Sequence, residues 1–191
     1  EETTHFSIVD KYGNAVSVTT TINGGYGSKV VVEGAGFLLN NEMDDFSVKP
    51  GYPNMFGLVG GEANSIEPNK RMLSSMTPTI IEKNDQLFMV VGTPGGSTII
   101  TSVFQTILNV IDYGMSMQEA VDSKKFHHQW LPDVLAVEEN TLSDNLINDL
   151  NQIGHKIVKR KTLGRMDCIL VMEDGSLEGG ADKRGDNVAL G

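Results

Sequence analysis

The first residues with the chemistry of a nucleophile stand near the start of the sequence, where Thr3-Thr4-His5 follows Glu1 and Glu2. A threonine hydroxyl attacks a carbonyl only when a base takes its proton. An α-amino group has an unperturbed pKa of about 7.7–8.0 and can be that base near neutral pH. Cleavage of the Glu2–Thr3 bond would therefore place nucleophile and base on one residue. Without cleavage Thr3 carries an amide, and the alternative is a threonine in a strand or at a cap.

A glycine turn, Pro94-Gly95-Gly96-Ser97, joins a predicted strand to a predicted helix. Glycines let the backbone approach a ligand closely, and a helix start presents free N–H groups with a partial positive charge. Such a turn can hold the oxyanion of a tetrahedral intermediate. The alternative is a tight turn with Ser97 as the N-cap, and it is compatible with the first interpretation.

An acidic cluster lies outside any predicted helix, where Glu42, Asp44 and Asp45 fall within four residues. It suits a substrate ammonium group or a solvated acidic loop. It lacks the spacing of a calcium loop, and no second cluster supports a metal site. Further on, Ser74-Ser75 offers paired hydroxyls that suit either a carboxylate or a local turn.

Histidines and the single cysteine give weaker signals. His127 and His128 are adjacent on an extended segment, so their side chains point to opposite sides and favour packing over metal chelation. Cys168 lies in an apolar run and is predicted to be buried and unreactive. No phosphate-loop or dinucleotide fingerprint is present.

The elements that must position these residues follow from periodicity. Alternation predicts two hairpins and later strands, and apolar residues at helical spacing predict three helices. The predicted hairpins span 5–22 and 79–91, with a short strand at 37–39 and an irregular segment at 40–75 between them. Helices are predicted from Ser97 to 111, from Ser116 with a capping box, and over 143–153; strands at 156–158 and 167–172 and a glycine-rich edge follow. Strands flanking a block of helices indicate an α+β layered sandwich.

Composition narrows the class of protein. The 191 residues are 39% hydrophobic and 21% charged, as in a globular domain. A formal net charge of −10 disfavours nucleic acid or an anionic membrane as the main partner. No apolar run approaches the roughly 18–20 residues of a membrane span. Because the chain opens on Glu-Glu rather than Met, we expect a processed fragment.

Six segments, taken in order, resemble the small subunit of the γ-glutamyltranspeptidases, which are N-terminal-nucleophile hydrolases. The match runs from Thr3 to about Asp182. The segments are Thr-Thr-His, Leu-Asn-Asn-Glu-Met-Asp-Asp-Phe-Ser, Gly-Leu-Val-Gly-Gly, Leu-Ser-Ser-Met, Pro-Gly-Gly-Ser and Phe-His-His-Gln-Trp-Leu-Pro-Asp. Family precursors cut themselves before the nucleophilic threonine into large and small subunits that stay together. The resemblance implies that Glu1 and Glu2 are residual precursor residues and that 3–191 form a single-domain small catalytic subunit.

The resemblance also implies roles by position. Thr3 matches the nucleophile, Thr21 the threonine that hydrogen-bonds it, and Gly95 and Gly96 the oxyanion-hole amides. The matches to the substrate's α-amino site are Asn23, Glu42 and Asp45, and those to its α-carboxylate site are Ser74 and Ser75. An arginine of the large subunit is expected to join the carboxylate site.

Some positions depart from the family pattern. Phe56 stands in the lid segment 50–60 where several members carry tyrosine, and a phenyl ring covers the site without donating the hydrogen bond that closes the lid. The other departures are Met72, Lys124 and Lys183 in place of prolines and Thr98 in place of an arginine. They bear on lid behaviour and acceptor preference, not on the core chemistry.

The α+β pattern fits what the resemblance implies, a four-layer αββα sandwich of the N-terminal-nucleophile hydrolase type, completed by a large subunit. The resemblance implies that the γ-glutamyl amide of glutathione and related compounds is cleaved through a γ-glutamyl-threonine ester. The acceptor is water or an amino acid or peptide, no cofactor or metal is expected, and family members work in the periplasm or outside the cell. The alternatives are a related acylase or poly-γ-glutamate-processing enzyme, which the ammonium-binding set disfavours, and a γ-glutamyl-binding module that never matures.

Overall fold

The computed structural model describes residues 3–191, and its first element is an antiparallel hairpin. Its strands are β1 (Thr3–Val9) and β2 (Ala15–Thr21). The carboxylate of Asp10 accepts hydrogen bonds from two backbone N–H groups of the turn and holds it closed. The register pairs Thr3 with Thr21, so the first residue of β1 faces the last residue of β2. The predicted hairpin is confirmed.

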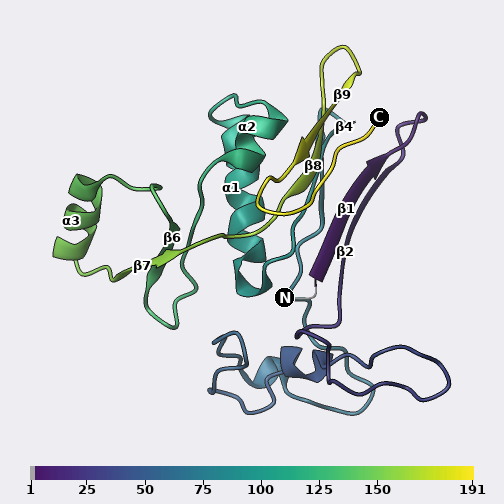
Figure 1. The fold of residues 1–191 in the computed structure, drawn as a ribbon, viewed down its shortest axis with the longest axis vertical. Helices are drawn as coiled ribbons and strands as arrows, with labels where there is room; N and C mark the ends of the chain where they lie inside the picture. The colour runs from purple at the N-terminus through teal and green to yellow at the C-terminus, as the bar shows by residue number, and fades with distance from the viewer. Residues whose placement is uncertain (1–2) are drawn as a thin grey trace.

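A four-stranded antiparallel sheet forms the second layer, in the order β3-β4-β8-β9. Its strands are β3 (Thr79–Lys83), β4 (Gln86–Val91), β8 (Asp167–Val171) and β9 (Leu177–Ala181). In Figure 1 the hairpin lies on one side of this sheet and the helices lie on the other. The predicted second hairpin and the glycine-rich last strand are confirmed.

Helices α1 (Ile99–Ile111) and α2 (Met117–Asp122) cover the outer face of the sheet (Figure 1). Their apolar side chains and those of β4 and β8 make the main core, and its members include Met89, Val91, Ile99, Val103, Met117, Val121, Met166, Cys168 and Leu170. The predicted capping box opens α2, because Ser116 accepts from the Glu119 N–H and the Glu119 carboxylate accepts from the Ser116 N–H. Cys168 is buried as predicted, and burial raises the pKa of its thiol to about 12.

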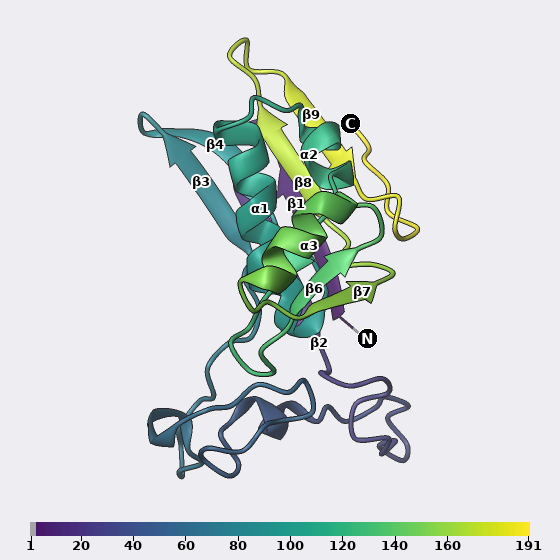
Figure 2. The same cartoon turned by 90° about the vertical axis from the view of Figure 1, so that its left-hand side faces the viewer.

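A smaller unit flanks the helices (Figure 2). It consists of β5 (Phe126–His127), β6 (Leu135–Glu138), α3 (Asp144–Gln152) and β7 (Ile157–Arg160). β6 and β7 pair in parallel, and α3 makes the crossover between them. The helix and the last strand are confirmed predictions, whereas the sequence did not predict β5 and β6.

The long segment between β2 and β3 has almost no regular structure, as the sequence predicts. In both views it lies at one end of the sheets, beside the start of β1 (Figures 1 and 2). It contains 3-10 turns at Glu42–Asp45 and Glu62–Asn64. The strand predicted at 37–39 is wrong: a single bridge joins Leu38 to Val31 across a glycine-rich turn, and no sheet lies beside it.

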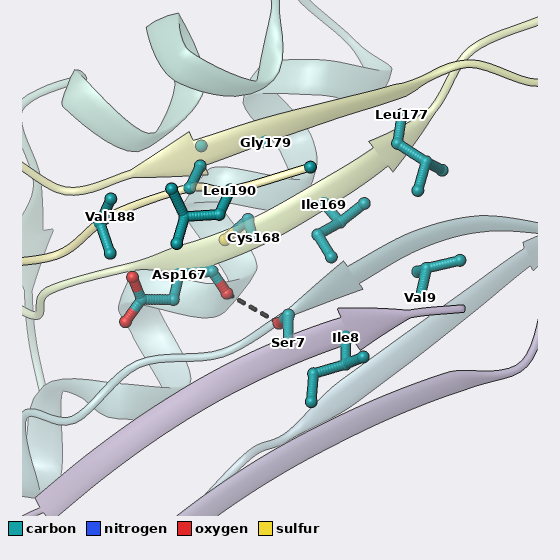
Figure 3. A pocket seen from close by; sticks show the side chains of 13 residues that line it. Ser7, Ile8, Val9, Asp167, Cys168, Ile169, Leu177, Gly179, Val188 and Leu190 are labelled. Atoms are coloured by element: carbon teal, nitrogen blue, oxygen red, sulfur yellow. Dashed lines mark hydrogen bonds between the residues drawn. The ribbon is translucent and has the colours of Figure 1, made fainter. Parts of the chain in front are cut away.

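A cavity of about 400 Å³ lies between the hairpin, the second sheet and the end of the chain (Figure 3). Ser7 and Asp167 both line this cavity, and the Ser7 hydroxyl donates a hydrogen bond to the Asp167 carbonyl at 2.8 Å, which joins β1 to β8. The Asp167 carboxylate accepts from Asn187 Nδ2 at 2.8 Å and so fastens the C-terminal segment to β8. Burial raises the pKa of Asp167 to about 6.

Taken together, the described residues supply three layers: two helices, a four-stranded sheet and a hairpin. The α+β class predicted from the sequence is confirmed. Among residues 3–191, no helix is long and apolar enough to cross a membrane.

Candidate active site

The hydroxyl of Thr3 is the centre of the site. Thr3 is buried, and its Oγ1 donates a hydrogen bond to Thr21 Oγ1 at 2.9 Å. The pair follows from the hairpin register, because directly opposed residues of an antiparallel pair bring their side chains together on one face. A backbone hydrogen bond from the Asn23 N–H to Thr21 Oγ1, also 2.9 Å, fixes the second hydroxyl. The predicted cut before Thr3 involves Glu2, and Glu1 and Glu2 lie outside the described residues.

Polar side chains continue along the inner face of the hairpin from Thr3. His5 Nδ1 lies 2.8 Å from Thr19 Oγ1, and His5 Nε2 lies 3.1 Å from Ser7 Oγ. Because the Ser7 hydroxyl donates to Asp167, it accepts from His5, which places the imidazole proton on Nε2. Burial lowers the pKa of His5 to about 4, so the ring is neutral. This polar ladder fixes β1, and with it Thr3, against the second sheet.

Thr3 opens into a small cavity that gathers most of the predicted site residues. Its lining is Thr3, Thr21, Asn23, Phe56, Leu58, Ser75, Met76, Gly96, Ser97 and Ile99, and its volume is about 10 Å³. The nucleophile candidate, its partner and Gly96 therefore share one space, which Phe56 and Leu58 cover. Gly95 lines a neighbouring cavity of about 90 Å³ with Arg160 and Arg165.

The glycine turn owes its shape to two left-handed residues, Gly95 (φ 152°) and Gly96 (φ 56°). A Cβ on Gly95 would lie 2.7 Å from Thr98 Oγ1, so only glycine fits there. Thr98 closes the turn by donating from both Oγ1 and its N–H to the Gly95 carbonyl, at 2.9 and 3.1 Å. Ser97 lies inside a 3-10 turn, Gly96–Thr98, and Thr98 is the residue before α1. The predicted Ser97 N-cap is therefore wrong.

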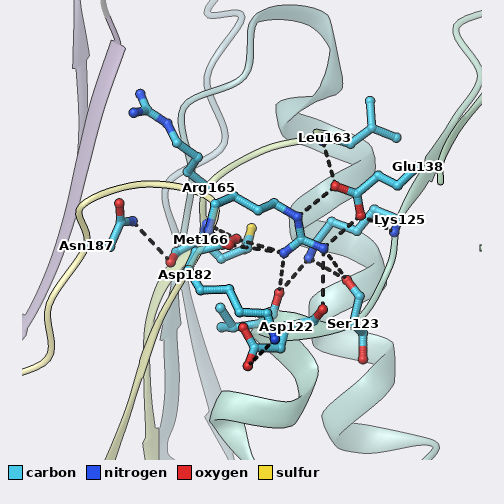
Figure 4. A network of polar contacts seen from close by, with 12 residues as sticks. Asp122, Ser123, Lys125, Glu138, Leu163, Arg165, Met166, Asp182 and Asn187 are labelled. Atoms are coloured by element: carbon cyan, nitrogen blue, oxygen red, sulfur yellow. Dashed lines mark hydrogen bonds and ion pairs between the residues drawn. The ribbon is translucent and has the colours of Figure 1, made fainter. Parts of the chain in front are cut away.

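A buried ionic network holds residues 163–165, which lie next to the glycine turn (Figure 4). Arg184 donates to both carboxylate oxygens of Glu138 at 2.7 Å and to Asp182 at 3.1 Å. Glu138 Oε1 also accepts from the Leu163 N–H at 3.0 Å, and the Arg165 N–H donates to Thr93 Oγ1 at 2.6 Å. Residues 163–165 are thereby joined to Thr93, the residue that precedes Pro94. Hydrogen bonds to Arg184 and to backbone N–H groups keep the pKa of Glu138 below its usual value despite burial.

Two carboxylates of the irregular segment lie close together near Thr3. Burial, and the neighbouring Asp45 carboxylate, raise the pKa of Glu42 to about 7, and burial also raises that of Asp45. Glu42 Oε1 is buried and has no hydrogen-bond partner among the described residues. Ser75 Oγ donates to Asp45 Oδ2 at 2.9 Å, which joins this pair to the wall of the Thr3 cavity. A substrate ammonium group would neutralise the charge of Glu42 and Asp45 and could donate a hydrogen bond to Glu42 Oε1.

Asn23 and Ser74 complete the predicted set. Asn23 is buried in a left-handed conformation (φ 71°), and its Nδ2 donates to the Asn41 carbonyl at 3.1 Å, next to Glu42. Ser74 is exposed and turns to its own backbone, since its hydroxyl donates to the Met76 carbonyl at 3.3 Å and accepts from the Met76 N–H at 3.2 Å. In this arrangement Ser75, not Ser74, borders the cavity.

The comparisons with known proteins agree with this geometry. The model of the γ-glutamyltranspeptidase family matches residues 1–191, the whole chain. The chain belongs to the γ-glutamyltranspeptidase family. It is 51% identical over 183 residues to the glutathione hydrolase proenzyme of Escherichia coli, an alignment that covers 96% of this chain and 31% of that protein. The chain thus spans about a third of the length of this relative.

Two solved γ-glutamyltranspeptidase structures superpose closely on the chain. An acivicin-inhibited enzyme, whose C-terminus has critical roles in autoprocessing and catalysis, gives a TM-score of 0.92 at 54% identity over 96% of this chain and 99% of that one. The Helicobacter pylori T380A mutant gives 0.91 at 54% identity, with 95% and 100% coverage. The predicted resemblance to this family and its fold type is confirmed.

The structure also shows contacts made by polar residues that are not among the predicted site residues. Asn41 accepts from the Gly24 N–H through Oδ1 at 2.8 Å and from Asn23 through its carbonyl. Asp44 and Gln129 both contact the lid segment. All three stand in quoted motifs, but each acts across a stretch of irregular chain, so no local pattern marks its contact.

The side chains of the two histidines in the Phe-His-His-Gln segment point to opposite sides, as predicted. His127 is buried between Thr101 and Gln129, whereas His128 lies on the other side and pairs with Asp133 at 3.0 Å. Within residues 3–191, no group of three His, Cys, Asp or Glu side chains is placed to hold a metal ion.

Proposed function

We propose that this chain is the catalytic small subunit of a γ-glutamyltransferase that cleaves γ-glutamyl amides such as glutathione. One observation carries the proposal: the Thr3 hydroxyl, hydrogen-bonded to Thr21, opens into a cavity whose wall residue Ser75 also binds the acidic pair. A γ-glutamyl donor needs the acidic pair to lie at a distance from Thr3, because the reacting carbonyl and the α-ammonium group are at opposite ends of the glutamyl group. The glutathione hydrolase proenzymes among the relatives support the same substrate class.

The proposed reaction has two halves. Thr3 Oγ1 attacks the γ-carbonyl carbon while the freed α-amine of Thr3 takes the hydroxyl proton. The Gly95 and Gly96 amides stabilise the oxyanion, and the leaving amine departs with the proton. Water or an acceptor amine then attacks the γ-glutamyl ester and releases Thr3. Glu42, Asp45 and Asn23 hold the α-ammonium group. On donor binding Ser74 and Ser75 turn their hydroxyl protons from the Met76 carbonyl and Asp45 to the α-carboxylate, which an arginine of the large subunit also binds. No cofactor is required.

Maturation would use the same hydroxyl. Thr3 Oγ1 attacks the Glu2 carbonyl carbon, the peptide bond becomes an ester with a free Thr3 amine, and water hydrolyses that ester. A large subunit from the same precursor would supply the fourth layer of the sandwich. Exposed apolar side chains on the outer face of the hairpin support this; they are Phe6 and Ile8. We place the enzyme in the periplasm or outside the cell.

The matched donors γ-glutamyl-p-nitroanilide and glutaryl-p-nitroanilide, which differ only in the α-amine, test the proposal on the two-subunit enzyme. Without the amine the buried acidic pair stays unsatisfied, so kcat/KM for the glutaryl compound should be at least about a hundredfold lower. Equal turnover of both would favour the acylase alternative. Tight γ-glutamyl binding with no turnover and an intact Glu2–Thr3 bond would favour the binding module.

A further inference from the structure

The tip of the lid is a turn, 54–58, organised by Asn54. Asn54 Oδ1 accepts from the N–H groups of Phe56 and Leu58, both at 3.0 Å, and the Asn54 carbonyl accepts from Gly57 at 2.9 Å. Phe56 and Leu58 line the Thr3 cavity, so this turn is its cover. The cavity of about 10 Å³ does not hold a glutamyl group, and we infer that the tip lifts when a donor reaches Thr3.

One side chain ties this tip to the helical layer. Gln129 Nε2 donates to the Phe56 carbonyl at 3.3 Å and to the Leu131 carbonyl at 3.0 Å. Both partners are acceptors, so the amide nitrogen must face them and the amide oxygen must face away. That oxygen lies 2.9 Å from His127 Nε2 and accepts its proton.

His127 is in turn fixed by α1. With the proton on Nε2, His127 Nδ1 can only accept, so Thr101 Oγ1, in the first turn of that helix, gives its one proton to Nδ1 at 2.8 Å in preference to the Thr98 carbonyl at 3.1 Å. The ring is buried, and burial lowers its pKa, which agrees with a neutral imidazole that carries one proton. A hydrogen-bond chain therefore runs from the helix that follows the Gly95-Gly96 turn, through His127 and Gln129, to the backbone of the lid tip.

A second contact holds the other side of the tip, where the Met55 N–H donates to Asp44 Oδ2 at 3.2 Å. Asp44 belongs to the same irregular segment as the lid, between β2 and β3. Gln129 belongs to the unit packed beside α1, so its bond is the one that must break when the tip lifts away from the helical layer. At 3.3 Å it is long for an N–H···O bond and therefore weak.

We propose that Gln129, oriented by His127, is the latch that holds the lid tip closed over Thr3. Both are positioning residues: neither lines the Thr3 cavity, and they act on it through Phe56. By controlling the lid they retain the donor, and this kinetic consequence rests on the proposed γ-glutamyl chemistry. Phe56 has no hydroxyl that could donate a hydrogen bond and hold the lid closed. In this chain the hydrogen bond from Gln129 Nε2 to the Phe56 carbonyl takes that place.

Limited proteolysis reads the latch without any substrate. Chymotrypsin cuts after aromatic residues, and the Phe56–Gly57 bond carries the very carbonyl that Gln129 binds. In the two-subunit protein, Gln129→Ala should speed appearance of the fragment ending at Phe56 about threefold to tenfold, the worth of one neutral hydrogen bond. The matched control is Gln105→Ala, which removes contacts to Phe126 in the same unit but none to the lid. A cut rate unchanged in Gln129→Ala, or raised equally in Gln105→Ala, overturns the latch.

The His127 variants test the orientation step. His127→Leu removes the donor to Gln129 and should speed the cut as Gln129→Ala does, whereas His127→Gln can place an N–H near the Nε2 position and should restore most of the protection. Equal cutting of the two variants would show that His127 only fills space, and would overturn its part in the latch.

Steady-state kinetics give the second readout. Because Gln129 contacts neither Thr3 nor the glycine turn, its loss should raise the donor KM about threefold to tenfold and change kcat less. A fall confined to kcat contradicts a latch. Failure of γ-glutamyl turnover in the unsubstituted enzyme would reject the proposed function, while the proteolysis rates would still decide the latch.

Discussion

The imidazole of His5 occupies the space that a side chain at position 92 would need. A Cβ built on Gly92, just past the end of β4, would overlap the His5 ring atoms. Because His5 lies two residues after Thr3 on the same face of β1, this contact sets how closely the strand with the nucleophile approaches the second sheet. Gly92 thus helps to position Thr3, although it lines no part of the cavity.

Gly92→Ala should destabilise the protein by about 1–3 kcal/mol, because neither the buried ring nor the strand can move without loss of packing. It should also lower catalytic activity by displacing β1. Urea unfolding followed by circular dichroism measures the first effect. Gly25→Ala is the control, since nothing lies within 4 Å of a Cβ there, and its effect should stay within about 0.5 kcal/mol. Equal unfolding free energies for the two variants would contradict this role of Gly92.

Thr21→Val tests the partner of the nucleophile with nearly the same shape. The valine cannot accept the hydrogen bond from Thr3, so the hydroxyl loses its fixed direction, and kcat should fall about tenfold to a hundredfold. Stopped-flow measurement of nitroaniline release would place the loss in the acylation step. Thr21→Ser, which keeps the hydroxyl, should recover most of the rate. Full activity in Thr21→Val would remove Thr21 from the mechanism.

Glu42 gives donor binding a pH dependence. Burial and the Asp45 carboxylate raise the pKa of Glu42 to about 7, so on the acid side the pair carries less charge to offer an ammonium group. The donor KM should therefore fall about tenfold between about pH 6 and about pH 8. In Glu42→Gln the KM should be high and nearly flat over the same range. A profile that Glu42→Gln leaves unaltered would assign the titration to another group.

Asp167 should link stability to pH. Burial raises its pKa from 3.8 to about 6, so the folded state binds the proton more tightly than the unfolded chain. Its contribution to stability is present below about pH 3.8 and is lost as the pH rises through about 6. Asp167→Asn removes this loss, and the unfolding free energy of the variant should gain about 1–2 kcal/mol over the parent between about pH 4 and pH 7, allowing for solvent screening at a half-buried group. Asp85→Asn, in an exposed turn, should gain nothing.

Much of the fold was predictable because its signals are local. The hairpins carry alternation and turn residues, and the helices carry apolar periodicity or a capping box. β6 shows where this fails. It ends on Glu138, a charge that a local pattern places at the surface; its burial depends on Arg184, 46 residues away, and on backbone N–H donors such as that of Leu163. β5 is two residues long, and the pairing that makes it a strand lies in β6.

The contacts of the site also divide into those that a local sequence pattern predicts and those that it does not. The Thr3–Thr21 contact follows from the register of one hairpin, and the glycine turn is visible in the sequence. The bond from Ser75 to Asp45 spans 30 residues of irregular chain, and that from Gln129 to Phe56 spans 73. Neither segment has a period that would fix its course, so tertiary contact alone decides which polar side chains meet there.

The central claim, that Thr3 carries the γ-glutamyl group as an ester, is tested most directly by peptide mass spectrometry of the two-subunit enzyme. The enzyme is mixed with γ-glutamyl-p-nitroanilide, quenched in acid during turnover and digested. The peptide that starts at Thr3 should then be heavier by one glutamyl residue, and base should remove this group as expected for an ester. A peptide in which Glu2 is still joined to Thr3, or a glutamyl group on any other residue, would contradict the account.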